Sequence, residues 1–184
     1  MKRIFLIAVL ICLLAISCNN KESNIDKEEN VKDITVTSTA FEHNGDIPKK
    51  YTCQGEEISP PVKWSGIPEG TKSIALISDD PDAPMGTWVH WVIFNIPPEK
   101  GGLEENIPKN DIVKGGIKQG KNSGKETGYQ GPCPPSGKHR YFFKVYALDY
   151  QPDLEAGISK QQLINAMEEH ILGYGELIGL YEKE

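Results

Sequence analysis

The sequence predicts a mostly β, antiparallel domain, on two observations. Short runs rich in apolar and β-branched residues are separated by clusters of glycine, proline, asparagine and aspartate, a pattern typical of strands joined by turns. Only one segment has the features of a helix. The expected strands are Ile34–Thr39, Ser73–Ser78, Val89–Ile96, Tyr141–Leu148 and Leu177–Tyr181.

The expected helix covers Lys160 to Leu172. Ser159 precedes it as an N-cap, Gln162 stands where a capping box has Gln or Glu, and Gly173 is suited to close it. Residues at three-to-four spacing would form its buried face, which we expect to cover a sheet edge or end. That face consists of Leu163, Ala166, Met167 and His170, and we interpret His170 as a helix-end residue rather than a ligand.

The first residues are typical of an export signal. Lys2 and Arg3 precede an uncharged apolar stretch, residues 4–14, which is too short to span a bilayer. The stretch closes on Leu-Ala-Ile-Ser before Cys18, which looks like a bacterial lipobox. We therefore expect residues 1–17 to be a lipoprotein signal peptide and Cys18 to be acylated. The protein would be exported and anchored by lipid to a bacterial membrane, facing away from the cytoplasm. The alternative is an ordinary signal peptide with an incidental Cys18.

Composition bounds the remainder of the chain. Residues 18–33 are rich in Asn, Lys and Glu and predict a flexible tether, because they cannot bury enough apolar surface to fold alone. The net charge is −6, and loss of the signal leaves 18 basic against 26 acidic side chains, a net charge of −8. This acidic balance argues against a nucleic-acid partner. Residues 34–184 have the length of one domain.

Two polar segments lie where strands begin or end. The first is Ser-Asp-Asp-Pro-Asp-Ala-Pro at residues 78–84, followed by Trp-Val-His-Trp at 88–91. The second is Gly-Pro-Cys-Pro-Pro-Ser-Gly-Lys-His-Arg-Tyr at 131–141. In this order they resemble the signature regions of the phosphatidylethanolamine-binding protein family, and most closely its bacterial, Raf-kinase-inhibitor-like branch. The resemblance covers residues 34 to 183 and implies an antiparallel β-sandwich with Greek-key connections and one or two peripheral helices.

The resemblance also implies a small anion pocket for a phosphate-bearing ligand or a phospholipid headgroup. A histidine there would donate to phosphate, and a carboxylate would orient the ring or face an ammonium group. Within residues 131–135 of the second segment, three prolines leave Gly131 and Cys133 as the only amide donors. The alternative for the aspartates is an Asx turn that caps backbone amides. The candidate ligand-binding residues are Asp80, Asp82, Pro84, Trp88, His90, Gly131, Pro132, Cys133, Pro134, His139 and Tyr141.

Strand alternation places the two histidines at a pocket mouth with apolar residues behind them. Trp88, His90, Val92 and Phe94 should share one face of their strand, and His139, Tyr141, Phe143 and Val145 one face of another. The alternative is two unrelated core histidines bonded to backbone carbonyls.

Two cysteines remain in the expected mature domain. The resemblance places Cys53 and Cys133 near the ligand site, and an exported chain permits disulfides, so a bridge and two free thiols are both open.

Three functions compete. The first is a binding module without a cofactor, which could control a protein partner such as a kinase or protease. The second is a hydrolase with a metal on His90, His139 and Asp80, although no strong metal or nucleophile motif occurs. The third is a surface inhibitor with a vestigial pocket, contacting its target through the Lys-, Asn- and Gly-rich loop expected at residues 97–128.

Overall fold

The computed structural model describes residues 31–184. The expected signal peptide (1–17), Cys18 and nearly all of the expected tether (18–33) lie outside the described residues. The first strand begins at Lys32, so the described fold starts just before the expected boundary at residue 34. Within residues 31–184, no helix has the length and apolar character needed to cross a membrane.

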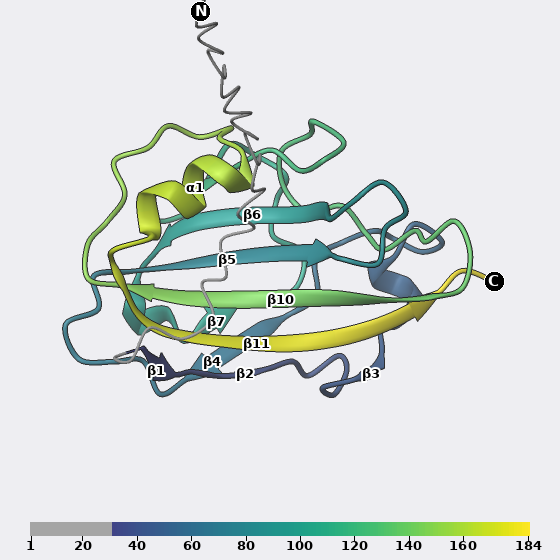
Figure 1. The fold of residues 1–184 in the computed structure, drawn as a ribbon, viewed down its shortest axis with the longest axis horizontal. Helices are drawn as coiled ribbons and strands as arrows, with labels where there is room; N and C mark the ends of the chain where they lie inside the picture. Colours follow the sequence, from purple (N-terminus) through teal and green to yellow (C-terminus); the bar gives the residue numbers. More distant parts are fainter. Residues whose placement is uncertain (1–30) are drawn as a thin grey trace, which may run out of the picture.

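The fold is mostly β, as predicted (Figure 1). The strands are β1 (Lys32–Asp33), β2 (Thr35–Thr37), β3 (Gly45–Asp46), β4 (Val62–Ser65), β5 (Ser73–Asp80), β6 (Trp88–Ile96), β7 (Gly102–Leu103), β8 (Ile112–Val113), β9 (Ile117–Gln119), β10 (Lys138–Leu148) and β11 (Ile171–Glu182). The α-helix is α1 (Lys160–Met167), and η1 (Lys49–Tyr51) and η2 (Pro98–Lys100) are short 3₁₀ turns.

The strands form two sheets. The larger has the order β1-β11-β10-β5-β6-β9-β8, with β3 also paired to β11, and the smaller has the order β2-β4-β7. β5 and β6 form an antiparallel pair, but β10 pairs with β5 rather than with β6, so the connection from β6 crosses past a strand. The pairs β1–β11 and β3–β11 are parallel, which the antiparallel prediction did not include.

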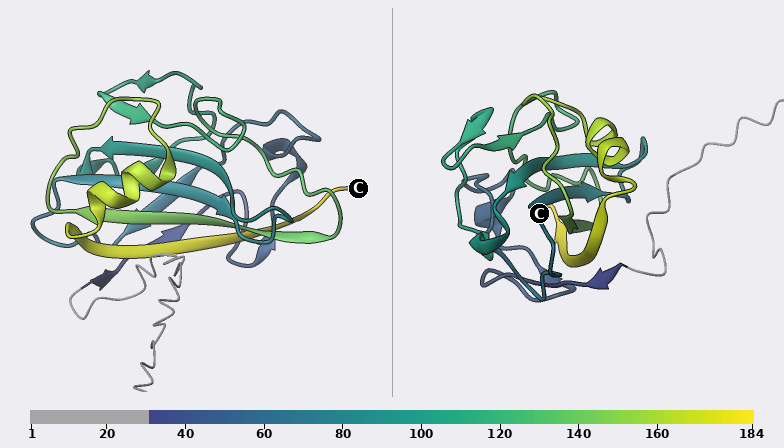
Figure 2. Two further views of the ribbon diagram at one scale, coloured as in Figure 1. Left: turned by 45° about the horizontal axis from the view of Figure 1, so that its top comes forward. Right: turned by 90° about the vertical axis from the view of Figure 1, so that its left-hand side faces the viewer.

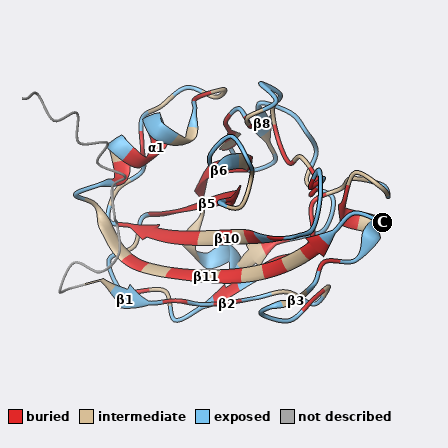
Figure 3. Ribbon diagram, turned by 45° about the vertical axis from the view of Figure 1, so that its right-hand side comes forward, coloured by how far each residue is buried: buried red, intermediate tan, exposed pale blue. Residues whose placement is uncertain are grey.

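Both faces of the large sheet are covered. One apolar cluster lies between the two sheets and contains Trp64 from β4 and Phe143 from β10. A second lies under α1 and contains Phe94 and Leu163. Figure 2 shows α1 lying across one face of the large sheet. This double coverage explains why every residue of β5 is buried, and Figure 3 shows the buried residues concentrated in the central strands.

The helix begins as predicted and ends early. Ser159 and Gln162 form the expected capping box, and Leu163 and Met167 are buried. The helix stops at Met167 because β11 starts at Ile171, where the backbone pairs with β10. Gly173 is therefore a strand residue and not a helix cap. A Cβ at this position would lie 2.9 Å from Pro68 Cγ, so close packing requires glycine there.

The segment 97–128 is more ordered than the expected loop. It contains η2, β7, β8 and β9, and β9 extends the large sheet beside β6. The buried Gln119 amide donates to the carbonyls of Pro108 and Asn110, at 2.8 and 2.7 Å, and its oxygen accepts the Trp91 indole N–H at 2.7 Å. These bonds fix the path of the segment on the sheet.

Candidate functional site

The predicted polar residues meet at one end of the large sheet. β5 ends there at Asp80, whose register partner Trp88 starts β6, and β10 starts beside β5 with Phe142 opposite Asp79. The antiparallel pairing thus brings the two sequence segments together. We call Asp80, His90, His139 and Tyr141 the histidine–tyrosine cluster.

Asp80 holds His139. The Nδ1 atom of His139 lies 2.8 Å from Asp80 Oδ2, and because a carboxylate only accepts, Nδ1 carries the hydrogen. The other oxygen, Asp80 Oδ1, accepts the Asp82 backbone N–H at 2.8 Å. Both side chains are buried. Asp80 therefore fixes the orientation of the His139 ring.

A bulge changes the predicted direction of His90. In the β5–β6 register Ser78 faces Trp91 whereas Asp79 faces Val89, so His90 is the extra residue. The His90 ring lies against Tyr141, with 5.2 Å between ring centroids. Tyr141 belongs to the apolar cluster between the two sheets, so His90 lies on that face of the large sheet. Val92 and Phe94 lie in the other cluster under α1. The prediction that His90 shares a face with Val92 and Phe94 is wrong, because strict alternation fails at the bulge.

Gln130 fixes the His90 ring. The Nδ1 atom of His90 donates to the Gln130 carbonyl at 2.8 Å, and the Gln130 N–H donates to the His90 carbonyl at 2.9 Å. The Gln130 side chain also accepts the Trp88 indole N–H at 2.9 Å. Burial lowers the pKa of His90, against the opposing effects of the Gln130 carbonyl and of nearby carboxylates. At neutral pH the ring is therefore neutral, with its hydrogen on Nδ1. The sequence analysis missed Gln130 because this residue contacts His90 through its backbone carbonyl and N–H, which its residue type does not reveal.

The Tyr141 hydroxyl is the unusual group of the cluster. Tyr141 is only 1 % exposed, yet its hydroxyl has no hydrogen-bond partner among the described residues. Burial, and next the charge of Asp80, raise the pKa of Tyr141, so the hydroxyl keeps its hydrogen and can donate. A buried hydroxyl without a partner is costly, and such groups in native structures call for an explanation.

Asp82 binds Arg140. The Asp82 carboxylate accepts bonds from Arg140 Nε at 2.9 Å, Nη2 at 2.6 Å and the backbone N–H at 3.0 Å. The side-chain bonds from Arg140 are the main reason that the pKa of Asp82 falls to about 2. Asp82 thus ties the loop after β5 to β10. The sequence analysis did not single out Arg140. This residue stands between His139 and Tyr141 and therefore lies on the opposite face of the strand from them.

The loop 131–134 is packed against the segment after η1. A disulfide joins Cys53 and Cys133, with 5.5 Å between their Cα atoms, and the Cys53 N–H donates to the Pro132 carbonyl at 3.1 Å. The Gly131 N–H donates to Glu57 Oε1, also at 3.1 Å. A Cβ on Gly131 would lie 2.8 Å from the Tyr51 carbonyl oxygen, so only glycine fits. The expected amide donor of Gly131 is therefore already bonded.

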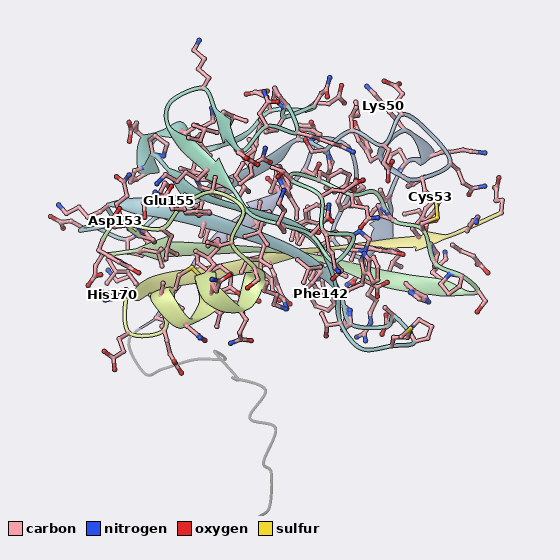
Figure 4. All side chains as sticks on the ribbon, turned by 90° about the horizontal axis from the view of Figure 1, so that it is seen from above. Lys50, Cys53, Phe142, Asp153, Glu155 and His170 are labelled. Atoms are coloured by element: carbon pink, nitrogen blue, oxygen red, sulfur yellow. A yellow bond between two sulfur atoms is a disulfide. The ribbon has the colours of Figure 1, made fainter. Side chains whose placement is uncertain are left out.

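The remaining predicted residues differ in their exposure. Pro132 and Pro134 are buried, Pro84 is exposed and the Trp88 residue is 38 % exposed. Figure 4 shows Cys53 near the end of β11, whereas His170 lies towards the opposite end, where it bonds Asp149.

Other features lie outside the cluster. A cleft of about 470 Å³ is lined by residues including Lys49, Lys138 and Tyr181. None of the predicted ligand residues lines it, although Lys138 is the chain neighbour of His139. Among residues 31–184, no group of three or more His, Cys, Asp or Glu side chains is arranged to hold a metal ion.

The comparisons with known proteins agree with the fold. The family model described as "Phosphatidylethanolamine-binding protein" matches residues 37–182. A "UPF0098 protein" of Methanothermobacter thermautotrophicus is 58 % identical over 150 residues, which cover 82 % of this chain and 99 % of that protein.

Two crystal structures share the fold. A phosphatidylethanolamine-binding protein homologue from Chlamydia trachomatis, CT736, has a TM-score of 0.76 and 43 % identity, covering 84 % of this chain and 99 % of its own. YbcL of E. coli, described as a new member of the mammalian family, has a TM-score of 0.76 and 32 % identity, covering 82 % and 99 %.

Proposed function

The chain belongs to the phosphatidylethanolamine-binding protein family, and from that premise we propose that it binds a small phosphate-bearing ligand at the histidine–tyrosine cluster. The ligand would be a free phosphomonoester or a phospholipid headgroup. The observation that carries the proposal is the buried Tyr141 hydroxyl, a donor without a partner among the described residues, on a ring that packs against His90. A phosphate oxygen would supply the missing acceptor.

The charges around the cluster favour a zwitterionic ligand. Asp80 bonds His139, and Asp82 pairs with the fixed cation Arg140. Burial lowers the pKa of His90, so that this ring is neutral at pH 7. A dianion such as inorganic phosphate would meet repulsion there. An ammonium group next to the phosphate, as in O-phosphoethanolamine, would offset it.

We also propose that the domain works outside the cytoplasm, held to a membrane by acylated Cys18. The support is the basic n-region, the short apolar stretch and the cysteine that follows it. An oxidising compartment agrees with the disulfide between Cys53 and Cys133.

Titration of the purified protein with O-phosphoethanolamine, phosphate and ethanolamine tests the proposal. The chain has four histidines, and His43 and His170 serve as internal controls because they lie outside the cluster. O-phosphoethanolamine should bind most tightly and shift the NMR signals of the His90 and His139 rings. Shifts confined to His43 or His170, or saturation with no ring signal moving, would place the ligand elsewhere.

A further inference from the structure

Glu57 lies beside the cluster in an unusual conformation. Its backbone φ is +55°, a left-handed value that is uncommon for a residue other than glycine. Its N–H donates to the Lys50 carbonyl at 3.0 Å, and its Oε1 accepts the Gly131 N–H at 3.1 Å. Hydrogen bonds at both the backbone and the side chain of Glu57 therefore hold its half-buried carboxylate at the edge of the 131–134 loop.

Glu57 is bonded differently from the aspartates nearby. Asp79 pairs with Lys144 and Lys160, and Asp82 pairs with Arg140. Asp80 pairs with His139. None of the ion pairs within residues 31–184 includes Glu57, whose carboxylate accepts a backbone amide hydrogen instead.

The Glu57 charge reaches the cluster. The carboxylates that raise the pKa of His90, against the larger effect of burial, are Asp80, Asp79 and Glu57, from β5 and from the segment after η1. The ring of Tyr141 covers His90 from β10, and the Gln130 carbonyl accepts its Nδ1 hydrogen. Glu57 also occupies one of the only two amide donors that the prolines leave in the loop.

We propose that Glu57 determines the charge specificity of the site. Its carboxylate takes the Gly131 amide away from an incoming anion and supplies the negative charge that a ligand ammonium group meets. The site thereby discriminates against dianions and favours ligands that carry an ammonium group beside the phosphate. This inference rests on the proposed function.

The test compares Glu57→Gln with Glu56→Gln, a matched control at the exposed neighbouring position. Glutamine keeps an oxygen for the Gly131 N–H and removes the charge. Glu57→Asn is a second neutral variant, because asparagine tolerates left-handed backbone. In both Glu57 variants the preference for O-phosphoethanolamine over inorganic phosphate, measured by calorimetry, should fall roughly fivefold to tenfold, the size expected for one partly screened charge. The Glu56 control should keep the wild-type ratio.

A ligand-free readout accompanies the calorimetry. Because the Glu57 charge raises the pKa of His90, Glu57→Gln should lower that pKa in an NMR titration, and Glu56→Gln should leave it unchanged. A variant that only loosened the loop would weaken both ligands equally and keep their ratio, which would refute the inference. If the ratio is unchanged while both ligands bind, only the role of Glu57 falls; if neither ligand binds the wild type, the binding proposal falls with it.

Discussion

Replacing Tyr141 by phenylalanine separates a ligand-binding hydroxyl from a structural one. The Tyr141 hydroxyl is buried and has no partner among the described residues, whereas the buried Tyr129 hydroxyl donates to the Tyr51 carbonyl at 3.0 Å. The same single-atom deletion at these two positions should therefore have opposite consequences for folding. Tyr129→Phe is the matched control for Tyr141→Phe.

The magnitudes follow from hydrogen-bond energetics. A buried polar group without a partner costs about 1–3 kcal/mol, so Tyr141→Phe should leave the free energy of unfolding unchanged or raise it by up to about 1 kcal/mol. Tyr129→Phe loses a bond and leaves the Tyr51 carbonyl without its donor, which should cost about 1–3 kcal/mol. For a domain of this size each kcal/mol corresponds to about 2–4 °C in Tm.

Binding should follow the reverse order. A hydrogen bond to a charged phosphate is worth about 1.5–3 kcal/mol, so Tyr141→Phe should weaken O-phosphoethanolamine binding by roughly tenfold to a hundredfold. Tyr129→Phe should bind nearly as the wild type does. Urea denaturation without ligand, and calorimetry with it, measure the two effects. Equal destabilisation by both substitutions, or unchanged affinity in Tyr141→Phe, would refute the reasoning.

Three further predictions concern the loops and the N-terminus. Arg140 is half exposed, so a double-mutant cycle of Asp82→Asn and Arg140→Gln should give a coupling of only about 0.5–1 kcal/mol at pH 7 in urea denaturation. Because folding lowers the pKa of Asp82 to about 2, this coupling should be fully present above the ordinary value of 3.8 and fade as the pH falls towards 2; a coupling that persists at pH 2 would contradict it. Reducing the Cys53–Cys133 disulfide should lower the free energy of unfolding by about 2–4 kcal/mol, since it closes a long loop of sequence separation 80, and an unmoved urea midpoint would show that the bridge is not a constraint. Cys18→Ser should abolish lipid attachment and shift the protein out of the detergent phase; unchanged partitioning would exclude acylation at Cys18.

The sequence was sufficient for the fold class and for the segments that form the site. The predicted runs correspond to β2, β5, β6, β10 and β11, because each is long or apolar enough to be recognised by composition. β3, β7 and β8 are two residues each and carry no such signal. The end of α1 was also out of reach, because it depends on pairing between β11 and β10 and not on the residues after Met167.

The direction of side chains was harder to predict than their position. Alternation holds along β10, where Tyr141, Phe143 and Val145 all lie in the apolar cluster between the two sheets. It fails on β6, because the bulge at His90 has no local sequence signature. Gln130 and Glu57 were missed for a related reason. Each acts across a loop contact that only the folded chain brings together.

The two sequence segments act as one unit because of the antiparallel register. Phe142 on β10 lies opposite Asp79 on β5. Because the two strands are antiparallel, the residues that precede Phe142 lie near the residues that follow Asp79. His139 accordingly bonds Asp80, Arg140 bonds Asp82, and Lys144 on the far side reaches Asp79. Each of these three aspartates thus pairs with a basic side chain of β10.

This complementarity also connects the site to the helix. Asp79 is fully buried, and its carboxylate pairs with Lys160, the first residue of α1, as well as with Lys144. Asp80, the next residue, points to the other face and holds His139. Removing the Asp79 charge would leave two half-buried lysines without their common partner, and the disturbance would fall on the strand end that positions the His139 ring. Asp80 and Asp82 therefore use their carboxylates to hold His139 and Arg140 in place. Under our proposal, Glu57, which lies outside both sequence segments, adds a further negative charge for a ligand ammonium group.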